Sequence, residues 1–253
     1  MAAEKPPTLT MESKARVLPA QQMTNILGEK PAEELHGRLW FTTAKFVDPA
    51  DIRDRTVLNI GCGFGWFEVW ALKMGVGRLT AIEIAEENLE TARKHIRDSR
   101  LEFKVGTGAA IPLPDASCDT VVTWEVIEHI PPQTEHLMFA DVKRVLKPGG
   151  AFYLSTPHRN FFSVVLDPAF WLNKHRHYSL QFLSETAQRA GFTVEKHAIK
   201  AGFREILDIW NLFASKWIFR RRRLFEKQSL AMTDRDYERE RGFNGIFMKF
   251  IKQ

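Results

Sequence analysis

Short runs rich in β-branched residues alternate with longer segments of helical periodicity between residues 56 and 155. The short runs predict strands and the longer segments predict helices, because apolar positions recur at different periods in the two structures. The predicted strands are 56–60, 78–83, 101–105, 120–124 and 151–155, and the predicted helices are 64–74, 85–97 and 133–146. Alternation of this kind predicts a parallel sheet with helices on both faces.

The alternation of strand-like and helix-like segments is less regular after Thr156. Residues 157–180 are rich in aromatic residues and histidine, which indicates a loop or cap, and Ser179 can begin a helix that ends at Gly191. A last pair of strands is predicted over 192–199 and 243–251, with a helical insertion over 201–241.

These elements predict an α/β fold with a doubly wound, mostly parallel seven-stranded sheet whose last strand is antiparallel. We expect an N-terminal helical cap over 1–50 and one larger domain over 51–253. The segments 157–180 and 201–241 are expected to be insertions in that domain.

Composition indicates the cellular compartment of the protein. Its two cysteines, Cys62 and Cys118, are far apart and form no metal-binding or redox motif, which favours a reducing cytoplasm. Residues 1–22 contain no apolar core of a secretory signal, and we expect no run long enough to span a bilayer. The net charge of +5 owes much to four consecutive arginines, Arg220 to Arg223.

The strongest motif is VLNIGCGFG over 57–65, in which a predicted strand leads through three glycines into a helix. Glycines allow a sharp turn and a close approach of a ligand to the backbone, and the helix N-terminus attracts anionic groups. The spacing is GxGxG, with Trp66 where a dinucleotide fingerprint has its third glycine, which argues against an NAD(P)-dependent oxidoreductase. Glu83 ends the next strand, where a carboxylate can accept both ribose hydroxyl protons of an adenosine ligand.

These residues resemble the class I S-adenosylmethionine-dependent methyltransferases, in particular their small-molecule group. The resemblance covers about 56–192 and continues through AIEIAEENLETAR, GTGAAIPLPDASCD, EVIEHI and LKPGG, in the order typical of the family. It implies a Rossmann-like fold with S-adenosylmethionine as cofactor. Gly61, Gly63 and Gly65 would line the methionine and ribose portion, and Glu83 would hold the ribose. The full cofactor set implied is Asn59, Gly61, Cys62, Gly63, Gly65, Glu83, Ile84, Thr107, Gly108, Ala109 and Trp124.

Two residues depart from the family pattern. Asn59 stands where the family usually has a carboxylate just before the loop, and Thr107 stands where an aspartate usually contacts the adenine. Asn59 can still hydrogen-bond the loop or the cofactor ammonium, and the Thr107 hydroxyl or the Gly108–Ala109 backbone can replace the aspartate. The departures predict a weaker affinity for the cofactor.

The EVIEHI segment allows three interpretations. It is a structural turn of the family, or His129 is a general base for an acceptor hydroxyl, or Glu125, Glu128 and His129 bind a metal ion. The third interpretation assumes that i, i+3 and i+4 spacing places the three side chains on one helical face. The spacing resembles the ExxEH ligands of metal-dependent small-RNA and some quinone methyltransferases, and His158, His175 or His177 could complete such a site.

Two regions bear on the acceptor. Residues 155–162 and 175–179 frame Phe170 and Trp171, which together predict either a pocket for a sugar or phenol ring or a capping loop. The HxHYS stretch also resembles methyltransferases of glycan, glycolipid and quinone pathways. Residues 206–225 place five apolar residues on one helical stripe before the arginines, namely Ile206, Ile209, Trp210, Phe213 and Trp217. This stripe predicts a core-facing or dimer-forming helix, or an interfacial helix on anionic lipid; nucleic acid is the least favoured partner.

The sequence therefore predicts an S-adenosylmethionine-dependent methyltransferase, with His129 as the candidate catalytic residue. The expected reaction is O-methylation of a small-molecule, sugar-linked or lipid-linked acceptor, in the cytoplasm or at the periphery of a membrane. The alternatives left open are a metal-dependent RNA methyltransferase that uses ExxEH and a non-catalytic module that binds the cofactor. The oligomeric state is left open.

Overall fold

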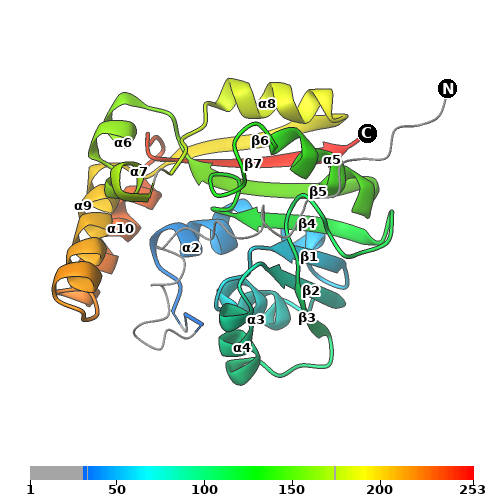
Figure 1. Ribbon diagram of the computed structural model, residues 1–253, viewed down its shortest axis with the longest axis horizontal. Helices are drawn as coiled ribbons and strands as arrows, with labels where there is room; N and C mark the ends of the chain where they lie inside the picture. Colours follow the sequence, from blue (N-terminus) through cyan, green and yellow to red (C-terminus); the bar gives the residue numbers. More distant parts are fainter. Residues whose placement is uncertain (1–30, 33, 174) are drawn as a thin grey trace.

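The computed structural model describes residues 31–32, 34–173 and 175–253 (Figure 1). The first 30 residues of the expected N-terminal cap, and the stretch considered for a secretory signal, lie outside the described residues. Within the described part of the cap, α2 (Gly37–Phe41), η2 (Thr42–Phe46) and η3 (Pro49–Asp51) are short helical segments. The division into a cap and one larger domain stays a prediction.

One seven-stranded sheet forms the centre of the molecule, in the order β3-β2-β1-β4-β5-β7-β6. Its strands are β1 (Thr56–Ile60), β2 (Arg78–Glu83), β3 (Leu101–Val105), β4 (Cys118–Trp124), β5 (Leu146–Pro157), β6 (Phe192–Lys200) and β7 (Gly245–Lys252). β7 runs antiparallel to both of its neighbours, β5 and β6, whereas the pairs among β1 to β5 are parallel. The predicted fold class is therefore confirmed.

Helices cover both faces of the sheet. The main helices are α3 (Trp66–Lys73), α4 (Glu86–His95), α5 (Glu135–Val145), α8 (Leu180–Arg189), α9 (Phe203–Phe213) and α10 (Glu226–Glu238). Successive residues of β1 point to opposite faces, so that Val57 packs with Phe67 of α3 while Leu58 packs with Phe139 of α5. Because both faces are buried, the central strands are almost continuously apolar, and this made them easy to recognise in the sequence.

Several boundaries differ from the predicted ones for local reasons. The first helix begins at Trp66, not Phe64, because Gly63 and Gly65 both have positive φ and cannot continue a helix. β5 begins already at Leu146, not at Ala151, and its pairing to β4 shifts register between Leu146 and Ala151. The helix N-cap at Ser179 is confirmed, since its side chain accepts a hydrogen bond from the Phe182 N–H over 3.1 Å.

The two predicted additions are helical. The first contains α6 (Phe161–Leu166) and α7 (Pro168–Asn173), and the second contains α9, the short π-helical turn η4 (Ala214–Ile218) and α10. β5 and β6 are followed directly by α6 and α9, so both additions begin at the carboxyl edge of the sheet; Figure 1 shows α6, α7, α9 and α10 grouped together there. None of the helices in the described ranges combines the length and the hydropathy that a bilayer crossing requires.

Candidate cofactor and acceptor site

The glycine loop between β1 and α3 has a conformation that only glycine adopts without strain at three positions. The φ angles are +74° at Gly61, +53° at Gly63 and +89° at Gly65. A Cβ atom on Gly61 would lie 2.4 Å from Cγ2 of Val126, whereas a Cβ on Gly63 would meet no atom within 4 Å. Gly61 is therefore required by the packing of the protein itself. Gly63 faces open space, which is where a ligand can approach the backbone.

The Glu83 carboxylate points at this loop. Its Oε2 accepts a hydrogen bond from the Gly63 N–H over 3.0 Å, and its Oε1 accepts one from the Ile84 N–H over 3.0 Å. The side chain is 8% exposed and sits at the end of β2, next to β1 in the sheet. The two strongest predicted cofactor residues are therefore in direct contact. A carboxylate held beside an open glycine loop fits the ribose hydroxyls of an adenosine ligand.

The turn after β3 extends the same edge of the sheet. The Gly106 N–H donates to the Glu83 carbonyl over 3.1 Å, and Thr107 bridges to Ala110, so Gly108 and Ala109 form the tip of this turn. A Cβ on Gly108 would lie 3.4 Å from Ile60 of β1. Thr107, Gly108 and Ala109 are thus brought beside Glu83, as the resemblance implies.

Cys62 and Trp124, two further predicted cofactor residues, have buried side chains. Cys62 is 2% exposed, and its N–H donates to the Ile82 carbonyl over 3.1 Å. The Trp124 ring packs among aromatic rings of the core, with its centroid 6.4 Å from that of Trp66 and 6.3 Å from that of Tyr153. Any contact of these two residues with a cofactor would therefore involve mainly their backbone atoms.

Asn59 does not bond to the loop but turns toward α3. Its Nδ2 donates to Oε1 of Glu68 over 2.7 Å, and both side chains are buried. Asn59 Oδ1 and Glu68 Oε2 find no hydrogen-bond partner among the described residues. Burial raises the pKa of Glu68 from 4.5 to about 7. The buried acid Glu68 thus lies one helical turn beyond the glycine loop. It contacts Asn59, which stands where the family usually has a carboxylate, and the sequence did not reveal this contact.

The Glu68→Gln variant is expected to be more stable than the parent protein at alkaline pH. Folding raises the pKa of this buried acid, so the folded state is favoured most at a pH below the pKa of the acid in the unfolded chain. That contribution to stability is lost as the pH rises through about 7. The rise from 4.5 to about 7 corresponds to roughly 3 kcal/mol, and glutamine keeps the oxygen that accepts from Asn59. Denaturant unfolding at about pH 5 and about pH 8 measures the difference, with exposed Glu90→Gln as control. A stability gain that is the same at both pH values would contradict this account of Glu68.

The helical face assumed for Glu125, Glu128 and His129 is wrong. Residues 125–130 form bends and turns after β4, and Glu125 has a φ of +56°. Glu125 instead accepts from the Ser155 hydroxyl over 2.7 Å through Oε1 and pairs with Arg38 over 2.8 Å through Oε2. Among the residues that the structure describes, no three His, Cys, Asp or Glu side chains are arranged to hold a metal ion. The metal interpretation therefore loses the geometry on which it was based.

Of the three histidines considered as further metal ligands, His158 and His177 bond to other residues. His158 Nδ1 is 3.0 Å from the Phe243 carbonyl, and His177 Nε2 is 3.0 Å from Asp167. Only His175 lies beside His129, with ring centroids 4.4 Å apart and the rings edge to face.

At the carboxyl edge, Glu128 is buried and His129 is half-buried, and each has one buried atom without a hydrogen bond. His129 Nδ1 and Glu128 Oε1 have no hydrogen-bond partner among the described residues, while Thr156 Oγ1 donates to Glu128 Oε2 over 3.1 Å. Burial lowers the pKa of His129, and the carboxylate of Glu125 only partly offsets this effect. Burial, with Glu125 nearby, raises the pKa of Glu128 well above its ordinary value. At neutral pH the His129 imidazole is therefore mostly uncharged, and the raised pKa of Glu128 favours the protonated form of that acid.

Four residues near this edge were missed in the sequence because they come from separate elements. Arg38 lies on α2, Glu205 on α9, Tyr237 on α10, and Asn244 immediately before β7. Glu205 accepts from the Tyr237 hydroxyl over 2.5 Å and from Asn244 Nδ2 over 2.7 Å. No local motif marks these positions. The N-terminal segment and the insertion thus both contribute polar groups to the edge that bears Glu125.

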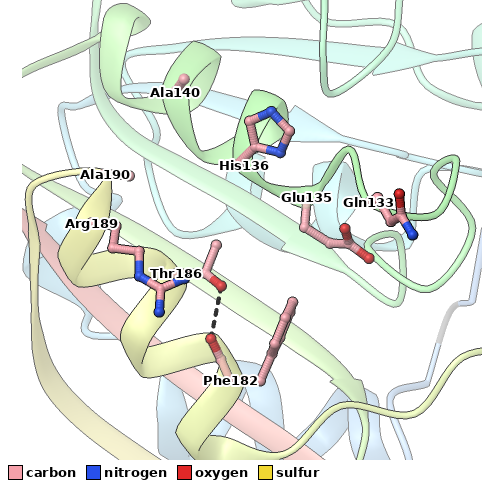
Figure 2. Close-up of a pocket in the computed structure, with 8 residues that line it drawn as sticks. All are labelled: Gln133, Glu135, His136, Ala140, Phe182, Thr186, Arg189 and Ala190. Carbon is pink, nitrogen blue, oxygen red and sulfur yellow. Dashed lines mark hydrogen bonds between the residues drawn. The ribbon is translucent and has the colours of Figure 1, made fainter.

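Two hollows lie away from these residues. One, of about 370 Å³, opens between α5 and α8 and is lined by Glu135, His136, Phe182 and Thr186 among others (Figure 2). The other, of about 430 Å³, lies between α9 and α10, where Leu207 and Phe225 are among its lining residues. None of the predicted cofactor residues lines either hollow, so neither is the cofactor site.

The comparisons with known proteins agree with the geometry. Residues 58–154 match the family described as "Methyltransferase domain". A protein of Mycolicibacterium smegmatis named "Probable S-adenosylmethionine-dependent methyltransferase" is 37% identical over 141 residues, 56% of this chain and 53% of that protein. A ubiquinone biosynthesis O-methyltransferase of Caulobacter vibrioides is 30% identical over 157 residues, 58% of this chain and 61% of that protein. The chain thus spans little more than half the length of these relatives.

A solved structure shows the same fold. The S-adenosylmethionine-dependent methyltransferase of Mesorhizobium loti superposes with a TM-score of 0.59 and 17% identity, covering 84% of this chain and 97% of that one. At this identity the likeness concerns the fold alone.

Proposed function

We propose that this chain acts as a class I S-adenosylmethionine-dependent methyltransferase and that it methylates a hydroxyl group of a small-molecule acceptor. The observation that carries the proposal is the Glu83 carboxylate bonded to the Gly63 N–H beside an open glycine loop. That arrangement fits the ribose of S-adenosylmethionine, which when bound supplies a methyl group activated by a sulfonium.

Residues from four places in the fold would hold the cofactor. Gly61, Gly63 and Gly65 form the loop, with Cys62 and Asn59 beneath it. Glu83 and Ile84 bind from the end of β2, and Thr107, Gly108 and Ala109 from the turn after β3. The backbone at Trp124 would face the cofactor from β4. Because the methyl group is already activated, the main task of these residues is to hold the two reactants in line at contact distance.

His129 is proposed to remove the proton of the acceptor hydroxyl. A base is needed because an alcohol is a poor nucleophile until it loses its proton. The lowered pKa keeps the imidazole uncharged at neutral pH, and its unbonded, buried Nδ1 is free to accept that proton. Glu125, fixed by Ser155 and Arg38, would then stabilise the imidazolium that forms.

The acceptor is proposed to be a neutral hydroxyl compound, either free or linked to a sugar or a lipid. The Caulobacter relative is named as an O-methyltransferase, which supports oxygen as the atom methylated. The edge around Glu125 carries Arg38, Glu205 and Tyr237, which can donate and accept hydrogen bonds from a polyhydroxylated ring. We place the protein in the cytoplasm or at the periphery of a membrane.

Labelling is the direct test of this function. The protein is incubated with S-adenosylmethionine labelled in its methyl group and with polar and lipid extracts of the source cells, and labelled products are identified by mass spectrometry. A methyl ether in the product would support the proposal. Labelled RNA would support a nucleic-acid methyltransferase instead, and tight binding of S-adenosylhomocysteine with no transfer to any extract would indicate a non-catalytic module.

Dialysis against EDTA is expected to leave the transfer rate unchanged. The described residues hold no preformed metal site, and an uncharged His129 can serve as the base without a metal ion. Rates measured before and after dialysis, with and without added Mg²⁺ or Mn²⁺, provide the check. A rate that is lost on dialysis and restored by metal would favour the ExxEH interpretation.

A further inference from the structure

An unusually apolar surface lies over the two helical additions. Six large side chains on α6, α7, α9 and the segment after it are exposed, and we call these six the aromatic face: Phe161, Trp171, Leu207, Trp217, Ile218 and Phe219. Phe161 and Ile218 are each 72% exposed, and Trp171 is 64% exposed. Soluble proteins rarely gather so many exposed large apolar residues in one region without a partner.

The two additions are joined into one surface by contacts that the sequence did not reveal. Trp210 Nε1 of α9 donates to the Leu166 carbonyl at the end of α6 over 2.8 Å. The ring of Phe162 on α6 packs edge to face with that of Phe203 on α9, with centroids 5.4 Å apart. Contacts between residues more than forty positions apart thus hold α6 against α9 and bring the exposed apolar residues of the two additions into one region.

The helix α9 already has its intramolecular partner on the opposite side. Ile206 and Asp208 are buried, and Asp208 accepts from the Ser229 hydroxyl of α10 over 2.6 Å. The predicted stripe is therefore divided, since Ile206 faces the core while Trp210 is 47% and Trp217 43% exposed. A core-facing role accounts for Ile206 and the contact with α6 accounts for Trp210, but large parts of Trp210 and Trp217 stay exposed.

Unpaired cations border the aromatic face. Arg223 pairs with Asp208 over 3.2 Å, but Arg220, Arg221 and Arg222 are exposed and form no ion pair with any residue that the structure describes. They follow Phe219 directly in the chain. Exposed tryptophan, isoleucine and phenylalanine beside free guanidinium groups suit the boundary between acyl chains and anionic headgroups.

We propose that the aromatic face and Arg220–Arg222 dock the protein on a membrane that contains anionic lipid. α6 and α9 follow the carboxyl ends of β5 and β6, so this face lies at the same edge of the sheet as Glu83 and Glu125. Docking would turn the site toward the membrane surface, where it could bind a lipid-linked acceptor. The binding of such an acceptor rests on the proposed function, whereas the docking does not.

Flotation of the full chain with lipid vesicles tests the docking. At low salt the protein is expected to float with vesicles of phosphatidylcholine and phosphatidylglycerol, and much less with phosphatidylcholine alone. Changing Arg220, Arg221 and Arg222 to serine should lower partitioning roughly 100-fold, since each surface cation contributes about fivefold. Ile218→Ser should also lower partitioning. On binding, the tryptophan emission should shift to shorter wavelength in the parent protein and the controls only.

Matched controls are available on other helices. Lys94→Ser with Arg97→Ser removes two exposed cations near α4, and Leu137→Ser removes an exposed leucine of α5; both should float as the parent does. Melting temperatures show whether each variant is folded, and titration with S-adenosylhomocysteine tests the proposed function separately. A protein that floats without binding S-adenosylhomocysteine would leave the docking intact and overturn the function, and the reverse would overturn the docking alone.

Three results would overturn the docking. The first is no flotation with anionic vesicles at low salt. The second is a stable dimer that Ile218→Ser dissociates, which would make the face an interface between copies. The third is retention on single-stranded RNA that the arginine variant loses while flotation stays unchanged.

Discussion

The Gly63→Ala variant is expected to fold normally and to bind S-adenosylhomocysteine roughly 100-fold more weakly than the parent protein, a loss of about 2.8 kcal/mol. A Cβ at this position meets no protein atom within 4 Å, so the substitution creates no internal clash. The added methyl group would occupy the space through which the cofactor approaches the backbone. The binding constants are measured by isothermal titration calorimetry and the stability by thermal unfolding.

The φ of +53° at Gly63 adds a strain of about 1 kcal/mol for alanine, and a control must account for it. Gly149→Ala provides that control, because Gly149 has a φ of +72° and its Cβ would also meet nothing within 4 Å, but it lies in the bulge of β5. Both variants should lose similar stability, and only Gly63→Ala should lose affinity. Equal affinities in the two variants would mean that the cofactor does not contact the glycine loop.

The His129→Gln variant is expected to lower kcat by about 10²- to 10⁴-fold, the usual contribution of a general base, with no change in affinity for S-adenosylhomocysteine. The structural reason is the half-buried imidazole beyond the carboxyl end of β4, whose Nδ1 has no hydrogen-bond partner among the described residues. Transfer is measured with the acceptor identified by labelling. The exposed His136→Gln variant on α5 is the control and should keep the parent rate.

The pH profile separates a base from a residue that only shapes the turn. Since burial lowers the pKa of His129 below 6.5, the parent's kcat/KM should be constant from about pH 7 upward and fall only as the imidazole becomes protonated at lower pH. In His129→Gln this acidic limb should disappear. A variant that is slower but keeps the same limb would assign His129 to the architecture of the turn and leave another group as the base.

Much of the fold could be predicted because its signals are local. Burial on both faces makes the central strands β1 and β2 short apolar runs, and both have the predicted bounds. The edge strand β3 also has its predicted bounds, although its residues are half-buried or exposed. The serine cap of α8 depends on a hydrogen bond between residues three positions apart. The Glu83–Gly63 contact spans 20 residues, yet the parallel pairing of β1 with β2 brings the two strand ends together in any protein with this pattern.

The error at 125–130 shows where local spacing fails. The i, i+3, i+4 pattern is compatible with a helix, but Glu125 is held at positive φ by its contacts with Arg38 and Ser155, which come from α2 and β5. The Asn59–Glu68 pair was also not foreseen. Its hydrogen bond depends on how α3 packs on β1, and a periodic pattern does not specify that distance.

The sequence alone determined the order of the strands and helices, the glycine loop, and the carboxylate that faces it, because these follow from backbone chemistry and from periodicities of a few residues. Tertiary packing decided which distant side chains meet: Arg38 with Glu125, Glu205 with Tyr237, and the helices α6 and α9 that together form the aromatic face. Such contacts depend on the positions of whole helices and strands in the folded protein. The chemistry around His129 and the surface beside Arg220–Arg222 therefore became visible only in the folded chain.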